Sequence, residues 1–332
     1  MAELIPLASS VSAPYKGVRT LVTGASGFIG RWVARLLSRA GADLVMATRD
    51  PSGLRSVVNQ LEIDGEALRA DLGDEAAVDA LVRRVRPAVT FHLAGYGVDR
   101  DETDEQEARR INVLAVRSIA DAVARWGSRD WPGPQLLHAG SAQEYGVSGA
   151  NLDEGAPARP TTVYGKTKLE GNVLLMERGG HPNLRALAVR LFTVYGPGER
   201  ASRLLPSLMR AAERGEPIAL TAGTQLRDFT YVGDVAEGFL RLGVCEAPGR
   251  CIVNLATGRL TSVREFVEIA APILGLPPER LNFGALPTRP EEMEHDAVTL
   301  VRLRQLTAGW QPGTSIGEGV RSTVARPISG MT

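Results

Sequence analysis

The feature that most constrains the fold of this chain is a glycine-rich turn near the N-terminus. The turn reads Thr23-Gly-Ala-Ser-Gly-Phe-Ile-Gly30, and it joins a β-branched stretch, Val18–Thr23, to a stretch of helical periodicity, Phe28–Ala40. A strand that passes through such a turn into a helix is typical of the first unit of a parallel α/β sheet. Backbone amides and the helix N-terminus can bind a pyrophosphate there. The spacing G-x-x-G-x-x-G therefore predicts an anion site built from Gly24, Ser26, Gly27, Phe28, Ile29 and Gly30.

Strand-like and helix-like stretches alternate regularly from this turn to about residue 192. Short β-branched stretches followed by amphipathic ones are the pattern of a doubly wound sheet. We predict an α/β fold in which residues 17–192 form a Rossmann doubly wound parallel sheet with helices on both faces. The expected strands are Val18–Thr23, Asp43–Thr48, Ala67–Ala70, Ala88–His92, Gln135–Ala139 and Leu184–Leu191, and the later helices are Asp74–Val85, Glu105–Trp126 and Val163–Glu177.

The sequence changes character after residue 192, where proline and glycine become frequent and the elements become shorter. We predict that residues 193–332 form a smaller C-terminal α/β lobe, mainly substrate-binding and partly interleaved with the first domain. Such a lobe would close over the carboxyl edge of the sheet, where open parallel sheets bind ligands. Residues 1–16, rich in Ala, Ser and Pro, are expected to be a flexible tail. In the lobe, helices are expected at Arg203–Arg214, Val232–Gly243 and Val263–Leu274, and strands at Ile218–Leu220 and Ile252–Leu255.

The composition argues against several classes of function. The formal net charge is zero and no basic stretch stands out, so neither nucleic acid nor an anionic membrane is an expected partner. No apolar stretch approaches the roughly 18 residues that a membrane span needs. Cys245 and Cys251 form no disulfide framework, and the 4 histidines have no metal-like spacing. We expect a cytoplasmic protein without a metal; pairing of the two cysteines is the alternative to reduced thiols.

Tyr164 and Lys168 stand four residues apart in a chain that is nearly devoid of lysine. Only Lys16, Lys166 and Lys168 are lysines, among 38 basic residues, so Lys168 is expected to do something that arginine cannot do. Residues four apart lie on the same face of a helix, and an ammonium beside a phenol lowers the pKa of the phenol. We therefore predict that Tyr164 acts as a general acid or base. An exposed pair on an ordinary helix is the alternative.

Polar and small residues follow the ends of several expected strands. Ser141 follows the fifth strand, within Gly140-Ser-Ala-Gln-Glu-Tyr-Gly146. Since the carboxyl ends of parallel strands meet at one edge, these residues are expected to line a single dinucleotide site. Beyond the glycine-rich turn, its expected contacts are Asp71 and Leu72 beside the adenine, Leu93, Ala94 and Gly95 in the middle, and Leu191, Val194, Tyr164 and Lys168.

Taken together, these motifs make the chain resemble the extended short-chain dehydrogenase/reductases, and more narrowly their nucleotide-sugar epimerase/dehydratase branch. The resemblance covers about residue 18 to about residue 320. Further matching stretches occur in the usual order of that branch, at Val189–Gly198, Arg227–Asp234, Arg289-Pro290 and Gly309-Trp310.

The resemblance implies a role for each matched residue. Tyr164 would exchange a proton with the C4 oxygen of a nucleotide-linked sugar, and Ser141 would hydrogen-bond the same oxygen. Lys168 would hold the nicotinamide ribose and lower the Tyr164 pKa, while hydride passes between C4 and the nicotinamide. The implied substrate contacts are Gln143, Thr193, Arg203, Leu204, Arg227 and Arg289.

Two further implications concern the substrate and the assembly. Arg227 and Arg289 match positions that bind the substrate diphosphate, whereas Thr193 departs from the asparagine common in relatives. The helices over 105–126 and 163–177 would pair across a two-fold axis, which implies a homodimer; the same amphipathic faces could instead serve the core.

The end of the second strand bears on the choice of cofactor. In NAD-specific proteins an acidic residue at this place binds the adenosine ribose. Here the residues are Thr48-Arg49-Asp50. Arg49 suits a 2′-phosphate and favours NADP(H). NAD(H) is the alternative, with Arg49 as a solvated cation and Asp50 on the ribose.

The residues after Ser141 bear on the reaction. Ala142 and Gln143 stand where dehydratases carry acid/base groups, and neither residue can transfer a proton at neutral pH. Glu144 is one position later and, if strand-like, would point the other way. We therefore expect NADPH-dependent reduction of a 4-keto group on a nucleotide-linked 6-deoxyhexose. The alternatives are a 4-epimerase and a catalytically silent NADP-binding scaffold.

Overall fold

The structure is a computed structural model of the chain, and it describes residues 7–98, 102–147, 152–180, 182–246, 249–287 and 296–326. The N-terminal part is built on a seven-stranded sheet with the order β11-β6-β5-β4-β1-β2-β3. All of its strand pairs are parallel. The strands are β1 (Arg19–Thr23), β2 (Asp43–Thr48), β3 (Glu66–Arg69), β4 (Val89–His92), β5 (Leu136–Ser141), β6 (Ala186–Leu191) and β11 (Arg250–Leu255).

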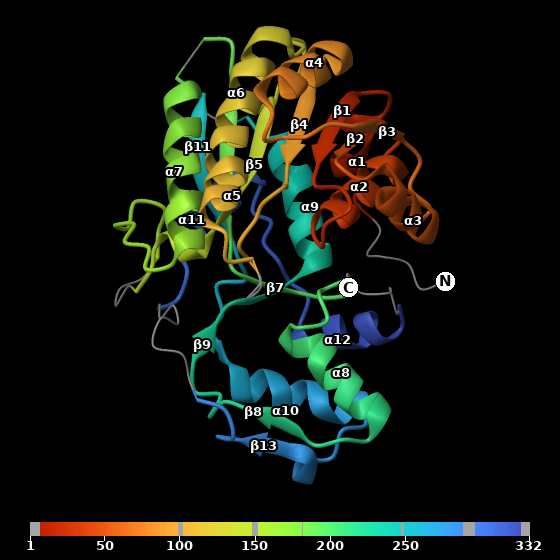
Figure 1. Cartoon of the computed structure of the whole chain (residues 1–332), viewed down its shortest axis with the longest axis vertical. Coiled ribbons are helices and arrows are strands. Elements are labelled where there is room, and N and C mark those ends of the chain that lie inside the picture. The colour runs from red at the N-terminus through yellow and green to blue at the C-terminus, as the bar shows by residue number, and fades with distance from the viewer. Residues whose placement is uncertain are drawn as a thin grey trace.

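Helices cover both faces of this sheet, which confirms the expected fold class (Figure 1). Strand residues alternate between two apolar clusters, so that Leu21 and Val45 pack on one face and Val22 and Met46 on the other. The first cluster is closed by α4 (Glu75–Val85), α6 (Ala115–Trp126) and α7 (Val163–Arg178), and the second by α2 (Gly30–Arg39), α3 (Pro51–Leu61) and α9 (Val232–Gly243).

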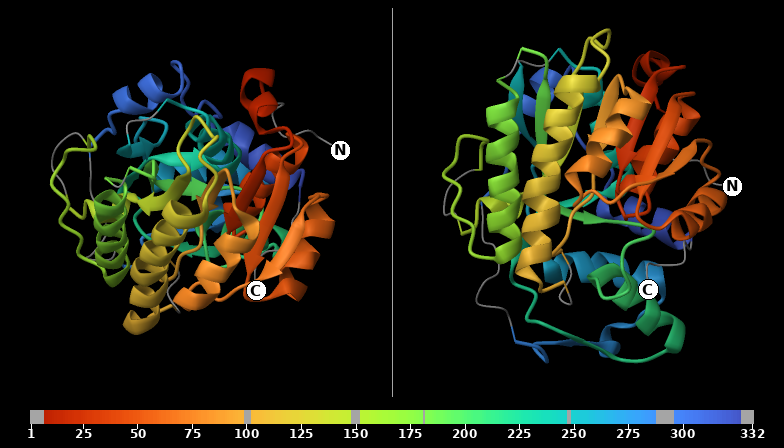
Figure 2. Two further views of the ribbon diagram at one scale, coloured as in Figure 1. Left: turned by 90° about the horizontal axis from the view of Figure 1, so that it is seen from above. Right: turned by 45° about the horizontal axis from the view of Figure 1, so that its top comes forward.

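The helix expected over Glu105–Trp126 consists of three segments. It runs as α5 (Glu105–Arg109), a π-helical turn η2 (Arg110–Leu114) and α6. Figure 2 shows this helix and α7 side by side along one flank of the sheet. A π-turn inserts one extra residue into a helix and is found frequently at functional sites.

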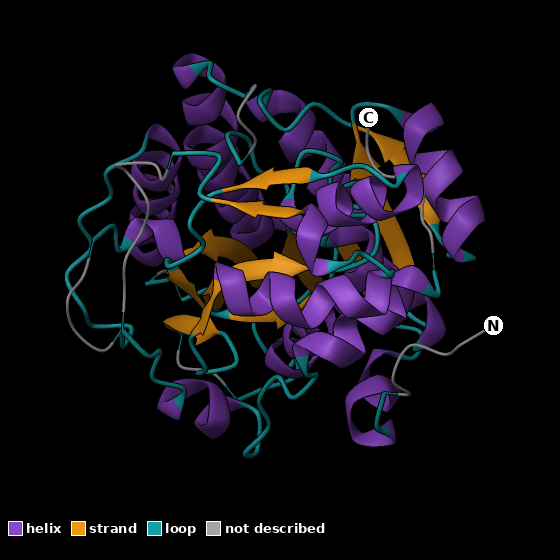
Figure 3. Cartoon of the chain, turned by 90° about the horizontal axis from the view of Figure 1, so that it is seen from below, coloured by secondary structure: helices purple, strands orange, loops and turns teal. Residues whose placement is uncertain are grey.

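The C-terminal lobe lies beyond the carboxyl edge of the sheet (Figures 1 and 3). It contains three two-stranded sheets, β7–β10, β8–β13 and β9–β12. The strands are β7 (Thr193–Tyr195), β8 (Ile218–Leu220), β9 (Leu226–Arg227), β10 (Phe229–Tyr231), β12 (Thr261–Ser262) and β13 (Leu281–Phe283). The helices that follow β7 and lie outside the main sheet are α8 (Leu204–Arg214), α10 (Val263–Leu274), α11 (Val301–Leu306) and α12 (Ile316–Val324), with a 3₁₀ turn η4 (Pro278–Arg280).

The boundary at residue 192 needs a correction. The stretches Val232–Gly243 and Ile252–Leu255, expected in the lobe, form α9 and the seventh strand β11 of the main sheet. β11 pairs with β6 from Arg250 to Leu255, and its Val253 and Leu255 are buried. The two parts of the chain are interleaved because the edge of β6 is covered by a strand about 60 residues further along.

The N-terminal segment also differs from expectation. The flexible tail predicted for residues 1–16 is wrong for residues 9–15, which form α1 (Ser9–Ser12) and a 3₁₀ turn η1 (Ala13–Tyr15). Tyr15 is fully buried, and its hydroxyl donates a 2.7 Å hydrogen bond to the Leu240 carbonyl of α9. Its ring packs against Trp131 and Phe91, so one aromatic side chain anchors the segment to the core.

The structure also bears on the expectations for the two cysteines and for membrane spans. Cys245 and Cys251 are both free thiols, the first buried and the second half-buried. Throughout the part of the chain that the structure describes, no helix combines the length and apolarity needed to cross a bilayer.

Candidate active site

The carboxyl ends of the parallel strands bring the predicted dinucleotide contacts to one edge of the sheet. From β6 to β3, this edge carries Leu191, Ser141, the segment Leu93–Gly95, the glycine-rich turn, Arg49 and Asp71. Leu191 and Leu72 are buried, and Val194 lies just beyond β6 in β7. The arrangement offers a ligand of dinucleotide length contacts along the whole edge of the sheet.

The glycine-rich turn is a cradle that side chains would fill. Gly24 has a φ of +73°, and a Cβ there would stand 2.6 Å from the backbone nitrogen of Ala94. A Cβ on Gly30 would overlap the Gly24 carbonyl, so the start of α2 packs directly on the turn. Glycine is required at both positions. The residues present fit the pyrophosphate of a nicotinamide dinucleotide, because backbone amides and a helix N-terminus converge here.

Arg31 is a buried cation beneath this turn. Its side chain donates to the carbonyl of Ser26 at 2.9 Å and to the carbonyl of Gly27 at 3.2 Å, and the residue is only 2% exposed. Desolvation lowers the pKa of Arg31, but an arginine remains charged at neutral pH. Sequence reasoning missed this residue, since one arginine among many carries no signal; its place directly after Gly30 was the only pointer.

A network of four charged side chains lies at the ends of β2 and β3, where the adenosine was expected. Arg49 pairs with Glu107 at 3.3 Å, and Glu107 in turn binds Arg110 at 2.6 Å. Arg110 also binds Asp71 at 3.0 Å. The guanidinium of Arg110 lowers the pKa of Glu107, and the backbone amide of Gly73 together with Arg110 lowers that of Asp71. The network links the ends of β2 and β3 to the start of α5.

Asp50 does not point along the edge of the sheet. Its carboxylate caps α3 by accepting hydrogen bonds from the amides of Ser52 at 2.9 Å and Gly53 at 3.0 Å. An Asp at a helix N-cap contributes about 0.5–2 kcal/mol. Arg49, by contrast, has a side chain that is 61% exposed, and an exposed ion pair of this kind is weak.

Ser141, Tyr164 and Lys168 meet where β5 ends and α7 begins. Thr162 caps α7 with its hydroxyl on the Gly165 amide, which places Tyr164 in the first turn of the helix. The Ser141 side chain lies close enough to the Tyr164 phenol to lower its pKa. Lys168 lies one turn further and is 2% exposed, whereas Tyr164 is half-buried. The strand end and the following helix therefore place the Ser141 hydroxyl near the Tyr164 phenol, with Lys168 one turn further along the same helix.

The expected lowering of the Tyr164 pKa is wrong for the protein alone. Burial raises the Tyr164 pKa to about 12, against the lowering effect of the Ser141 hydrogen bond. The largest charge effects on the phenol come from Glu144, Arg203 and Glu102. Helical spacing predicts a shared face, but burial decides the pKa here.

Lys168 lies beside His138, whereas the sequence predicted Tyr164 as its neighbour. Its Nζ lies 3.3 Å from Nε2 of His138 in β5, and burial lowers the Lys168 pKa to about 8. His138 stacks on His92 of β4 at 5.0 Å between ring centroids, and His92 Nδ1 lies 2.6 Å from the Thr23 hydroxyl. Burial lowers the pKa of both imidazoles, that of His92 to about 3. Both rings are therefore neutral, and Nε2 of His138 can accept a hydrogen bond from the Lys168 ammonium.

Asn112 is another residue near the site that sequence reasoning missed. It lies within the π-turn, fully buried, and its side-chain amide donates to Thr167 of α7 at 3.0 Å and to the Tyr96 carbonyl at 2.8 Å. Its side-chain oxygen accepts from the Tyr96 amide at 3.0 Å. Asn112 therefore ties the segment after β4 to the helix that carries Tyr164 and Lys168.

The expected substrate contacts are spread over several elements. The exposed Gln143 accepts a hydrogen bond from Thr162, and Thr193 opens β7. Arg203 occupies the N-cap position of α8 without a side-chain capping hydrogen bond, and Leu204 is the first residue of that helix. Arg227 ends β9, and its guanidinium contacts the Leu226 carbonyl at 2.7 Å. Arg289 lies outside the described residues.

Charged residues of the lobe approach Tyr164. Arg200 pairs with Glu102 at 3.0 Å, and Glu102 also accepts from the Gly97 amide. Glu199 is buried and lies 3.5 Å from Arg203, and burial raises its pKa to about 7. Since Arg203 and Glu102 both act on the Tyr164 pKa, this group of charges lies beside the phenol.

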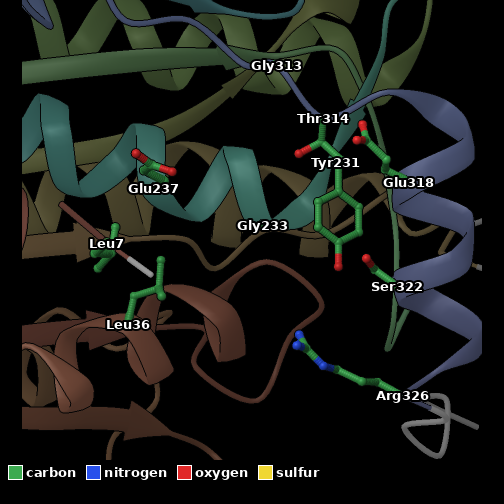
Figure 4. A pocket seen from close by; sticks show the side chains of 10 residues that line it. All are labelled: Leu7, Leu36, Tyr231, Gly233, Glu237, Gly313, Thr314, Glu318, Ser322 and Arg326. Carbon is green, nitrogen blue, oxygen red and sulfur yellow. The ribbon is translucent and has the colours of Figure 1, made fainter. Parts of the chain in front are cut away.

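A separate cavity of about 310 Å³ lies between α2, α9 and α12 (Figure 4). It contains none of the predicted site residues; its lining includes Leu36, Tyr231, Glu237, Ser322 and Arg326. Figure 4 shows the Tyr231 hydroxyl directed toward Ser322, which is also its hydrogen-bond partner.

Other proteins are similar to this chain both in sequence and in fold. A UDP-glucose 4-epimerase of Mycolicibacterium smegmatis is 30% identical over 92% of this chain and 97% of the relative. A dTDP-6-deoxy-L-talose 4-dehydrogenase (NAD(P)(+)) of Kitasatospora kifunensis is 28% identical over 94% of this chain and 96% of the relative. The solved structure of MoeE5 with UDP-glucose and NAD superposes with a TM-score of 0.79 at 29% identity, covering 92% of this chain and 97% of that one.

The family profile described as the NAD dependent epimerase/dehydratase family matches residues 20–256, which include the glycine-rich turn, Ser141, Tyr164 and Lys168. The chain therefore belongs to the NAD dependent epimerase/dehydratase family.

Proposed function

We propose that this protein reduces the C4 keto group of a nucleotide-linked hexose, preferably a 6-deoxyhexose, with NADPH as the reductant. The observation that carries the proposal is the meeting of Ser141, Tyr164 and Lys168 at the sheet edge, beside a cradle suited to a dinucleotide. The named activities of the relatives support a nucleotide sugar as substrate.

The raised pKa of Tyr164 suits a proton donor. When bound, the nicotinamide supplies a hydride to C4, and the C4 oxygen then needs one proton. With a pKa of about 12, the phenol is fully protonated at neutral pH and can give that proton to the nascent alkoxide. Ser141 lies close to Tyr164 and would donate to the same C4 oxygen, which would stabilise the developing charge.

Lys168 supplies the positive charge at this end of the site. Its ammonium, held against the neutral His138, would bind the ribose hydroxyls of the cofactor.

Dehydration is disfavoured by the residues next to Ser141. Ala142 and Gln143 have no group that transfers protons at neutral pH. Glu144 has a carboxylate, but the residue is fully buried and its oxygens accept hydrogen bonds from Ser141, Asn172 and Arg190. This segment thus lacks the second acid/base pair that removal of water requires.

The preference for NADPH is supported by Asp50 as well as by Arg49. The carboxylate that would bind the adenosine ribose in an NAD-specific site is engaged in capping α3. Arg49 is exposed and is held only by a weak ion pair with Glu107. A 2′-phosphate could therefore replace the Glu107 carboxylate as the partner of Arg49 at a small cost in free energy.

A 4-epimerase is the second candidate, because it needs the same three residues and several relatives carry that name. The two reactions differ in net consumption of cofactor. The test measures absorbance at 340 nm while purified protein is incubated with NADPH and a dTDP- or UDP-4-keto-6-deoxyhexose. Stoichiometric loss of NADPH supports the reductase. A second incubation contains oxidised cofactor and a dTDP- or UDP-hexose with a free C4 hydroxyl, and interconversion of its 4-epimers without net formation of reduced cofactor supports the epimerase. Tight cofactor binding without turnover of either substrate type would contradict both and indicate a scaffold.

Tyr164→Phe tests the proton donor. The variant keeps the ring but cannot donate, so kcat should fall about 10²- to 10⁴-fold with cofactor affinity unchanged. Tyr145→Phe is the matched control, since its hydroxyl bonds Asn254 at 2.8 Å instead of Tyr164 or Ser141. Equal kcat for wild type and Tyr164→Phe would contradict the mechanism.

Arg49→Ala tests the cofactor preference. The Kd for NADP(H) should rise at least about tenfold while that for NAD(H) changes little, since loss of a charge-assisted hydrogen bond costs about 1.5–3 kcal/mol. Fluorescence titration with both cofactors measures the two constants. Equal losses for the two cofactors would refute the NADP preference.

A further inference from the structure

Glu144 is a fully buried carboxylate with three hydrogen-bond donors around it. Its Oε1 accepts from the Ser141 amide at 2.7 Å and from the Asn172 side chain at 2.6 Å. Its Oε2 accepts from Nε of Arg190 at 2.8 Å. The residue lies in the 3₁₀ turn η3 (Ala142–Glu144) and not in a strand, so its side chain folds back under Ser141 in a capping box.

The three donors come from three different elements. Ser141 ends β5, Asn172 belongs to α7, and Arg190 belongs to β6. α7 is also the helix that carries Tyr164 and Lys168. One carboxylate therefore connects the strand end that presents the serine to the helix that presents the phenol and the amine.

Stability alone does not account for this arrangement. Desolvation of a carboxylate and a guanidinium costs several kcal/mol each, and a well-packed apolar pair is often as stable as a buried ion pair. The structure meets that cost with short bonds and with Arg190 stacked over the Tyr145 ring at 4.3 Å. An apolar pair could not replace the directional hydrogen bonds that Glu144 accepts from Ser141 and Asn172.

We propose that Glu144 is a positioning residue that fixes the Ser141 hydroxyl relative to Tyr164 and Lys168. The inference rests on the proposed function only for its effect on turnover. A displacement of about 1 Å in a reacting geometry can cost about 10²-fold in rate, so a bond that holds a strand end against a helix can matter as much as a contact to substrate.

The charge of Glu144 also acts on both titrating groups of the site. It raises the Tyr164 pKa and raises the Lys168 pKa. The other charged or titratable groups that face these two residues are His138 of β5, His92 of β4, Arg203 at the start of α8 and Glu102 of the segment before α5. Both imidazoles are neutral, so within this set Glu144 is the carboxylate that acts on both Tyr164 and Lys168.

The first experiment compares Glu144→Gln with wild type. In glutamine an amide NH2 replaces one carboxylate oxygen, so it faces a donor among Ser141, Asn172 and Arg190 and should displace the side chain. The change also removes the charge and leaves Arg190 without a counter-ion. We expect kcat to fall about 10²-fold with KM nearly unchanged, and the alkaline limb of the kcat profile to move to lower pH, because both pKa values fall. The double variant Glu144→Gln/Arg190→Met removes both charges, so the pair is again neutral overall. It also serves as the test variant if Glu144→Gln alone folds poorly. Its alkaline limb should return toward that of wild type while kcat stays low.

The second experiment needs no turnover. With three lysines in the chain, ¹³C-lysine labelling gives three ε-carbon signals, and Lys168→Arg identifies the relevant one. The Lys168 signal should titrate near pH 8 in wild type and at lower pH in Glu144→Gln.

An unmoved Lys168 titration, or a loss of kcat without a shifted limb, would overturn the proposal and leave Glu144 a merely structural residue. Absence of wild-type turnover would refute the proposed function instead, and the lysine titration would still decide the role of Glu144.

Discussion

Lys168 is a residue of the candidate site whose protonation is strongly affected by the fold. It is buried against the sheet, with a neutral imidazole as its nearest partner, and desolvation lowers its pKa to about 8. An arginine would stay charged in the same place, because its pKa is above 12. The lysine therefore gives the site a charge that disappears at mildly alkaline pH.

This shift predicts how cofactor affinity depends on pH. Below pH 8 the ammonium is present and can donate to the ribose; as pH rises through about 8 the free protein loses this charge and affinity should fall. Isothermal titration of NADPH between pH 6.5 and 9.5 measures the effect. Lys168→Met should bind more weakly at pH 7 and show a flat profile through this range; a sloping profile in that variant would assign the effect to another group.

The identity of the reacting residues can be read from sequence, but their electrostatics cannot. Tyr164 and Lys168 share a helix face, and Ser141 follows a strand, so local patterns suffice to bring them together. The Tyr164 pKa moves in the opposite direction from expectation because burial raises it, and the charge of Glu144, which lies on another element, raises it further. Asn112 and Arg31 escaped notice for the same reason.

The π-turn and α7 are in close contact near the site. Gly171 of α7 lies so close to the Asn112 carbonyl that a Cβ there would overlap it. The absence of one side chain thus allows the two helices to approach and brings Asn112 within reach of Thr167.

Gly171→Ala should separate these helices. We expect a loss of about 1–3 kcal/mol in unfolding free energy from overpacking, although alanine favours helix, and a fall in kcat because Tyr164 and Lys168 move with α7. Gly317→Ala in α12 is the matched control, since a Cβ there meets only the Arg321 side chain, at 3.4 Å. Urea denaturation and steady-state kinetics are measured for both variants. Equal unfolding free energies and equal kcat values would show that the contact with Asn112 does not limit how closely the two helices approach.

Individual elements were predictable where periodicity is local. The strands β1, β2, β4, β5 and β6 lie within two residues of their expected positions. α3 was missed because Pro51 and Gly53 in its first turn suggest a loop, whereas a proline at the first helical position and the Asp50 cap favour a helix start. β11 was expected as a strand but assigned to the lobe, since nothing local reveals which edge a strand joins.

At the scale of the whole molecule, the flank formed by η2 and α7 has apolar residues exposed. Leu114 in η2 is 44% exposed, and Val163 and Val173 in α7 are 42% and 49% exposed. The two segments lie side by side, and these side chains support the proposed homodimer (Figure 2).

Leu114→Glu/Val173→Glu should therefore give a monomer. Placing two carboxylates on an apolar interface costs several kcal/mol on each side, so light scattering after gel filtration should show half of the wild-type mass. Val324→Glu on α12, 42% exposed on a different element, is the control and should keep the wild-type mass. A wild-type monomer would refute the dimer.

The position of β11 has a consequence for synthesis of the chain on the ribosome. β6 is left with an open hydrogen-bonding edge until residues 250–255 emerge, about 60 residues after β6 itself. During that interval the nascent sheet presents the kind of unpaired edge that recruits foreign strands. A fragment that stops at residue 192 should therefore accumulate in inclusion bodies, whereas a fragment that extends past β11 should refold. Both fragments are expressed at equal levels and the lysates are centrifuged. The share of each fragment in the pellet distinguishes the two outcomes.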